Sequence, residues 1–296
     1  MLPAILFVLQ TAHLPAADRA PVHNQRFWRA VIEHEFEPPA GQPVEVLAHE
    51  LSAMLASPDP EVRDETAYAV LTAWIYQKHR IDGPLLLQLT DEWLSNLENG
   101  IGSTGNDGVV LRSFSALMLS VVVARDNAEP FLDAEHERRL FDAAIHYLRS
   151  EKDVRGYDPR LGWVHSAAHT ADLLKFLARS RYGKPADQEI ILDAIALKLA
   201  GAGVVFTEGE DERFARTLLS LVNRADFDRP AFDAWIARVL KDASLPAKPT
   251  AAALHGRQNV TNLFSKLYVI LATSPQQNES IHAVEESLLK NLRTLY

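Results

Sequence analysis

Apolar residues recur at three- and four-residue spacing along the chain from His23 to the C-terminus. Segments such as FWRAVIEHEF, VEVLAHELSAMLA and EHERRLFDAAIHYLRS gather these apolar residues on one face of a helix. Period-two alternation between hairpin turns, the pattern of a half-buried strand, is absent. The one strongly β-branched run, VVVA, ends a longer helical pattern. The sequence therefore predicts an all-α fold.

The breaks between the helical segments carry helix punctuation, with Pro130, Pro185 and Pro230 expected in connectors. Short helices joined by short turns favour stacked helical hairpins, that is, an irregular α-solenoid or α/α superhelix. The segment SPDPEVRDETAYAVLTAWI resembles one HEAT-type repeat, and no second regular copy of it is apparent. A compact bundle of the same helices is the alternative architecture.

The first 20 residues differ from the rest of the chain. An apolar run, Leu2 to Leu9, is followed by small residues, as in a signal peptide, but the charged segment that normally precedes the run is missing. We interpret residues 1–20 as a signal peptide or a disordered N-terminus, and residues 21–296 as a single helical domain. A signal peptide favours a periplasmic or secreted location. A wrongly assigned start codon or a frayed tail is the alternative.

Composition excludes several classes of function. The net charge is -9 and no Lys/Arg run occurs, so binding to nucleic acid is not expected. The chain has no cysteine, which excludes disulfides, Cys-ligated zinc and thiol nucleophiles. The N-terminal run is too short to span a bilayer, and we expect no transmembrane segment elsewhere.

The segment VHSAAHTADLLKFLARS contains the main candidate site. If the chain is helical from about Leu161 to Ser180, then His165, His169 and Asp172 lie within about 60° of one another around the helix axis. Two His at this spacing can coordinate one divalent metal ion, and Asp172 could add an oxygen ligand or orient a ring. A His beside a carboxylate can also act in general acid–base catalysis.

The same residues also allow a structural interpretation. His pairs four residues apart occur in hydrogen-bond networks and on solvated faces, and the glutamate of the H-E-x-x-H pattern is missing. In the preceding loop, Arg155, Tyr157, Asp158 and Trp163 could line a binding pocket. Alternatively, Trp163 fastens the loop to the core and Asp158 stabilises a turn.

Two further clusters are candidate binding residues. Glu210 and Asp211 crowd the first turn of a helix, where the helix dipole stabilises carboxylates without any ligand. They could instead meet Arg155 or complete a cation site. His255 and Arg257 could bind a carboxylate or an amide, or they could simply be part of a polar loop that opens a helix.

Four segments together resemble a bacterial family of helical proteins known as domain of unknown function number 2785. They are LRSFSALMLS, EKDVRGYDPRLGWVHSAAHTADLL, GEDERFARTLLSL and HGRQNVTNLFSKLY. The resemblance covers most of the chain after about Gln42. Its specific part is RGY, then GW-H-x-x-x-H-x-x-D-L-L, which is intact here. The resemblance implies an all-α fold and no particular activity.

Two functions follow from these observations. The first is a binding or scaffold module that holds a protein or peptide partner in a groove of the helical array, an inference from the fold alone. The second is a metal-assisted hydrolase centred on His165, His169 and Asp172. Glu210 or Asp211, with Arg155 or His255, would assist from neighbouring helices. We favour binding, because the sequence contains no complete catalytic signature.

Overall fold

The computed structural model describes residues 22–293, and the all-α prediction is confirmed for them. The predicted signal peptide, residues 1–20, lies outside the described residues. One long helix is built from three consecutive elements, η2, α3 and η3, of which η2 and η3 have π-helical backbone. The helices are α1 (Gln25–Glu33), α2 (Val44–Met54), η2 (Glu61–Tyr68), α3 (Ala69–Thr72), η3 (Ala73–Gln77), α4 (Gly83–Glu98), α5 (Gly108–Ala128), α6 (Ala134–Ser150), α7 (Ser166–Leu177), α8 (Pro185–Gly201), α9 (Glu210–Val222), α10 (Arg229–Asp242), α11 (Ala251–Ala272) and α12 (Glu279–Leu292).

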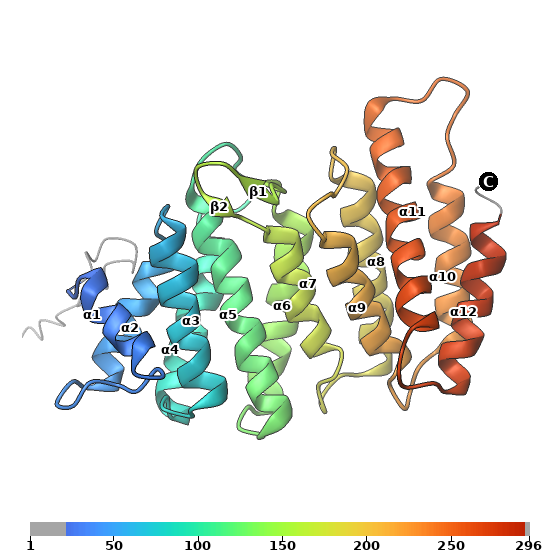
Figure 1. The fold of residues 1–296 in the computed structure, drawn as a ribbon. Coiled ribbons are helices and arrows are strands. Elements are labelled where there is room, and N and C mark those ends of the chain that lie inside the picture. The colour runs from blue at the N-terminus through green and yellow to red at the C-terminus, as the bar shows by residue number, and fades with distance from the viewer. Residues whose placement is uncertain (1–21, 294–296) are drawn as a thin grey trace, which may run out of the picture.

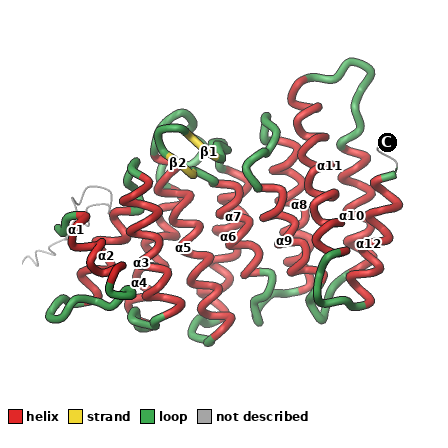
Figure 2. Tube along the Cα trace, in the orientation of Figure 1, coloured by secondary structure: helices red, strands yellow, loops and turns green. Residues whose placement is uncertain are grey.

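From α2 to α12 the helices form two layers that run side by side along the molecule (Figure 1). In one layer η3 contacts α5, α5 contacts α7, α7 contacts α9, and α9 contacts α11. In the other layer α2, α4, α6, α8, α10 and α12 contact one another in the same order. Loops connect successive helices at both ends of the layers, as the tube in Figure 2 shows. We call the layer that contains η3, α5, α7, α9 and α11 the odd layer, because it contains the odd-numbered helices from α3 to α11.

Several helix starts follow the punctuation in the sequence. Side-chain oxygens of Asp82 and Asp133 accept hydrogen bonds from backbone N–H groups in the first turns of α4 and α6. Pro185 and Pro230 lie inside the first turns of α8 and α10 rather than in connectors, which corrects the expectation for these two residues. The first turn has no intrahelical acceptor for their backbone nitrogens, so proline costs little there.

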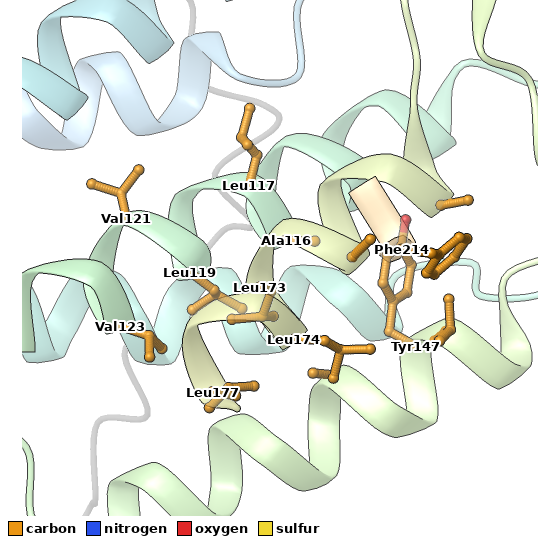
Figure 3. Packing of buried hydrophobic residues seen from close by; sticks show 14 of the residues in the cluster. Ala116, Leu117, Leu119, Val121, Val123, Tyr147, Leu173, Leu174, Leu177 and Phe214 are labelled. Carbon is orange, nitrogen blue, oxygen red and sulfur yellow. The ribbon is translucent and has the colours of Figure 1, made fainter. Parts of the chain in front are cut away.

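The core is continuous between the layers. Figure 3 shows α5 and α7 packed side by side, with Leu173, Leu174 and Leu177 of α7 in the interior. Tyr147 of α6 and Phe214 of α9 close this part of the core from neighbouring helices. Because α7 touches α5, α6 and α9, its position is set by three partners at once. The candidate site lies on the remaining side of α7.

Helix α5 is buried on almost every side. By length and composition alone it is the one helix among residues 22–293 that could cross a membrane. Most of its apolar stretch lies inside the protein, against α4, α7 and η3. A helix that is apolar all round is expected at the centre of a large helical core. The structure therefore accounts for α5 as a core helix.

Truncation of a core side chain on α7 should be costly. Leu174 is fully buried, so we expect Leu174→Ala to lower the free energy of unfolding by about 2–5 kcal/mol, through lost burial and the cavity left behind. Leu197→Ala is the matched control, because Leu197 is 60% exposed and its truncation should change stability by less than about 0.5 kcal/mol. Urea denaturation of both variants measures the difference. Equal effects would contradict the packing described for α7.

Candidate functional site

A short β-hairpin precedes α7, at the end of the odd layer near α5 (Figure 1). Its strands are β1 (Tyr157–Asp158) and β2 (Gly162–Trp163), which pair antiparallel. The sequence predicted only an ordered loop here, because strands of two residues are too short to show alternation. The hairpin moves the start of α7 to Ser166, about five residues after the expected start.

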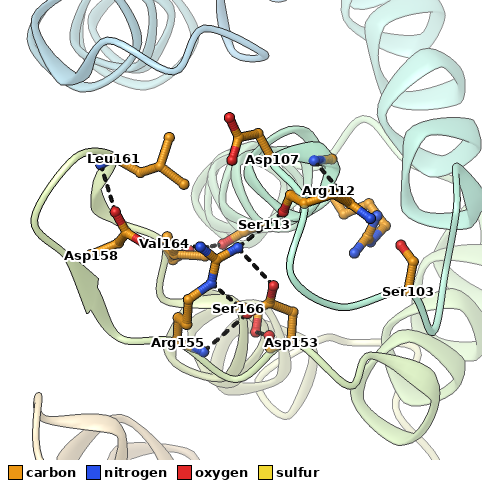
Figure 4. A network of polar contacts seen from close by, with 12 residues as sticks. Ser103, Asp107, Arg112, Ser113, Asp153, Arg155, Asp158, Leu161, Val164 and Ser166 are labelled. Atoms are coloured by element: carbon orange, nitrogen blue, oxygen red, sulfur yellow. Dashed lines mark hydrogen bonds and ion pairs between the residues drawn. The ribbon is translucent and has the colours of Figure 1, made fainter.

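Polar contacts fix the hairpin on the end of α5 (Figure 4). The Arg155 guanidinium donates to both carboxylate oxygens of Asp153, to Asp158 and to the backbone carbonyl of Asn106. Asp158 in turn accepts the backbone N–H groups of Arg160 and Leu161, at 2.9 and 3.0 Å. Arg155 and Asp158 are thus committed to holding the loop, which explains why this loop carries so many charged residues.

Gly156 lets the loop before α9 approach the hairpin closely. A Cβ atom at this position would lie 2.5 Å from Glu208 Oε2 and 2.7 Å from Glu210 Oε1. Any larger residue would push these two side chains away. Since the Glu208 carbonyl contacts the ring of His165 at 3.2 Å, the glycine indirectly sets the position of that ring.

His165 does not belong to the helix but caps it. Its backbone has φ 49° and ψ 34°, the left-handed region that is unfavourable for residues other than glycine. The hairpin holds this conformation, because the His165 N–H is bonded to the Arg155 and Gly156 carbonyls. The ring stacks on Trp163 with centroids 4.5 Å apart. Burial lowers the pKa of His165, and the positive charge of Arg213 lowers it further.

His169 is buried and has a defined hydrogen-bond arrangement. Its Nδ1 lies 2.8 Å from the Ser113 hydroxyl oxygen, and the same hydroxyl is bonded to the Val164 carbonyl. A carbonyl only accepts, so the single Ser113 proton goes to Val164, and His169 Nδ1–H must donate to Ser113. The other ring nitrogen, Nε2, is then an unprotonated acceptor. Burial lowers the pKa of His169 well below its usual value, with His165 and Arg213 acting in the same direction.

His169 Nε2 has no hydrogen-bond partner among residues 22–293, and it is not sealed from solvent. The residue forms part of the wall of a cleft. A neutral imidazole nitrogen there can accept a hydrogen bond from a ligand or, as a weak base, a proton. This is the most chemically distinctive atom of the site.

Asp172 is buried between two cations. Lys175 Nζ lies 2.7 Å from its Oδ1, and the Arg213 guanidinium of α9 is bonded to its Oδ2. One carboxylate therefore neutralises only one of two positive charges. The Arg213 side chain is 44% exposed and the Lys175 side chain 17% exposed. The excess positive charge is therefore more accessible to solvent at Arg213 than at Lys175.

These residues line a cleft of about 710 Å³ on the odd layer. Its long walls are three stripes of side chains, one from each of three neighbouring helices. Such a volume is typical of sites for small molecules or short peptide segments. The stripes are Asp64, Tyr68, Thr72 and Tyr76 of the η2–α3–η3 helix; Phe114, Leu117, Val121 and Ala124 of α5; and His165, His169, Asp172 and Phe176 of α7 with its cap.

The remaining sequence candidates lie elsewhere. Glu210 is buried and accepts the backbone N–H of Glu208, and burial raises its pKa. Asp211 accepts the N–H of Glu212 at the start of α9, as expected for a carboxylate in the first turn. None of these carboxylates forms an ion pair with Arg155. Glu210 therefore helps to position Glu208, whose carbonyl contacts His165.

His255 and Arg257 of α11 lie apart from the cleft formed by α5 and α7. His255 Nδ1 contacts the Gly203 carbonyl at 2.7 Å. Arg257 lines a second, more apolar cleft of about 400 Å³ between α8, α10 and α11. The structure brings together His165, His169 and Asp172 with Trp163, but not with His255 or Arg257.

A metal ion is poorly matched to the first cleft. Among residues 22–293 no group of three or more His, Asp or Glu side chains is arranged to hold one. Asp172 already has two cationic partners, and His169 Nδ1 is bonded to Ser113. The Arg213 charge that opposes protonation of both imidazoles opposes a metal cation in the same way.

Three residues that shape the site were not predicted from the sequence. Lys175 could have been found, because it lies one helical turn after Asp172. Arg213 lies in the segment GEDERFARTLLSL, in which only the carboxylates were considered as candidate binding residues. Ser113 gave no signal, since an isolated Ser in an apolar helix has no distinctive pattern.

A family comparison agrees with the resemblance seen in the sequence. Residues 97–269 match the model of a family described as protein of unknown function (DUF2785). The chain belongs to this family. The match begins at residue 97, later in the chain than the start near Gln42 that was expected from the resemblance. It includes α5, the hairpin, α7 and α9. No curated protein and no solved structure matches the chain.

In this DUF2785 protein the tautomer of His169 can be observed directly. We expect nitrogen chemical shifts at pH 7 to show a protonated Nδ1 and an unprotonated Nε2, because Ser113 fixes the ring. Ser113→Ala should remove this preference and give a mixture of tautomers. Ser120→Ala, another buried serine of α5, is the control and should leave the shifts unchanged. A protonated Nε2 in the parent protein would contradict the assignment.

Acid should destabilise the protein through His169. In the unfolded chain the imidazole binds a proton near pH 6.5, whereas the buried ring stays neutral in the folded state. The stability is therefore fully present above pH 6.5 and is lost as pH falls toward 5, by at most about 1.4 kcal/mol per pH unit for this proton. We expect His169→Gln to flatten this slope in urea denaturation. His282→Gln, an exposed control, should keep the parent slope.

Proposed function

We propose that the protein is a binding protein, in which an irregular α-solenoid of HEAT-like helical hairpins holds a short peptide segment in the cleft of the odd layer. Contacts between helices follow the order of the chain within each layer, as in stacked helical hairpins. Both layers continue without a break from η2 to α12, in keeping with a single domain over residues 21–296.

The observation that carries this proposal is the direction of the cleft. Its lining residues are spaced by three or four along each of three helices, so the cleft runs lengthwise along them. On α5 the lining extends from Phe114 to Ala124, about 15 Å at the helical rise per residue. An extended chain rises about 3.3 Å per residue, so four or five residues of peptide fit this length.

The lining also suits a peptide chemically. Tyr68, Tyr76, Phe114 and Phe176 offer aromatic surface for side chains. Charged groups gather around Asp172, where they could bind a polar or charged end of the chain. A mostly apolar lining with a few polar groups at fixed positions is the usual composition of a specific ligand site. The metal-assisted hydrolase has no comparable support, for the electrostatic reasons given above.

The test is selection of peptides followed by a block of the cleft. We would incubate the full chain with random pentapeptides, prepared both as free acids and as C-terminal amides, and measure the affinity of those retained. Ala124→Trp places a bulky side chain in the cleft and should weaken binding at least tenfold. Ala128→Trp, one turn further on α5 and outside the cleft, is the matched control and should bind like the parent.

Two outcomes would refute the proposal. If no pentapeptide is retained, the cleft does not bind peptides of the length that it accommodates. If peptides bind but Ala124→Trp weakens them no more than Ala128→Trp does, they bind elsewhere on the protein.

A further inference from the structure

Arg213 is held in place with most of its donors unused. Its bond to Asp172 engages one guanidinium nitrogen, Nη1, and no other hydrogen bond joins the guanidinium to a residue in the described range. The side chain is 44% exposed and lines the cleft. An Arg fixed at one nitrogen and open along its other edge is well prepared to bind a carboxylate through two parallel hydrogen bonds.

The charge around Arg213 favours an anion in this part of the cleft. Lys175 and Arg213 share the single carboxylate of Asp172, which leaves one positive charge uncompensated. Two other acidic side chains line the cleft. Asp64 is paired with buried Arg63 at 2.6 Å, whereas Glu208, near His165, accepts the Thr207 hydroxyl and keeps its negative charge. Beside Asp172 a ligand amine would meet the two cations, whereas a carboxylate there would be attracted by them.

His169 supplies the second recognition element, one helical turn before Asp172. The residue is only 6% exposed, and its unprotonated Nε2 has no partner among residues 22–293. This acceptor is reached from the cleft, so a ligand N–H or O–H placed there can donate a hydrogen bond to it in place of water. The Ser113 bond keeps this nitrogen an acceptor, so it discriminates against a ligand that offers a lone pair at that point.

The terminal residue of a peptide carries both matching groups on one Cα atom. We infer that the cleft recognises the free carboxyl end of its peptide, with Arg213 binding the terminal carboxylate and His169 Nε2 accepting the amide N–H of the last residue. This inference rests on the proposed function and specifies which part of the peptide is read. Capture of a terminal carboxylate by fixed donors is a known mode of peptide recognition.

The experiment compares matched ligands on matched proteins. Each pentapeptide retained by the full chain is synthesised as the free acid, as the C-terminal amide, and as the acid with its last amide nitrogen methylated. Affinities are measured by calorimetry for the parent, for Arg213→Met and for Arg238→Met. Arg238 is the control, because it is 50% exposed and paired with Asp193 at the second cleft, much as Arg213 is paired with Asp172.

We expect the amide and the N-methylated acid each to bind at least tenfold more weakly than the free acid. Arg213→Met should weaken the acid tenfold and remove its advantage over the amide, while Arg238→Met should change neither. Equal affinity of acid and amide, combined with loss of both in Ala124→Trp, would overturn this inference and leave the proposed function standing. Retention of no pentapeptide would overturn both.

Discussion

The hydroxyl of Ser113 joins three parts of the molecule that are far apart in the chain. It lies on α5, donates to the carbonyl of Val164 at the end of the hairpin, and accepts from His169 on α7. A side chain this small is needed, because α5 is buried and α7 packs directly against it. The same contact that fixes the hairpin over the cleft therefore also fixes which nitrogen of His169 faces a ligand.

The electrostatics of the cleft depend on that arrangement. With His169 and His165 both kept neutral by burial and by Arg213, the charges that remain near the middle of α7 are Asp172, Lys175 and Arg213. Their sum is positive, although the whole chain carries a net charge of -9. Local charge, not net charge, decides which ligand the cleft attracts. Around Arg213 and Lys175 the arrangement thus favours anions over both metal cations and amines.

Much of the fold could be predicted because it is encoded locally. Helical periodicity and caps such as Asp82 and Asp133 act within a few residues of one another. The position of His165 could not be predicted in this way. Its left-handed backbone is imposed by hydrogen bonds to the hairpin, so extending the helix back to about Leu161 placed its ring on the wrong element.

The sequence by itself determined an all-α chain, the approximate helix boundaries, and the placement of His169 and Asp172 on one face of a helix. Only the tertiary structure decided what that face does. Ser113 reaches His169 from 56 residues away, and Arg213 reaches Asp172 from 41 residues away. Periodicity states which side of a helix is apolar, but the choice of neighbouring helix follows from how all the apolar faces can be buried together. Because α5 and α9 are the neighbours of α7, the predicted metal site is instead a cleft in which the neutral Nε2 of His169 lies near the excess positive charge of Lys175 and Arg213.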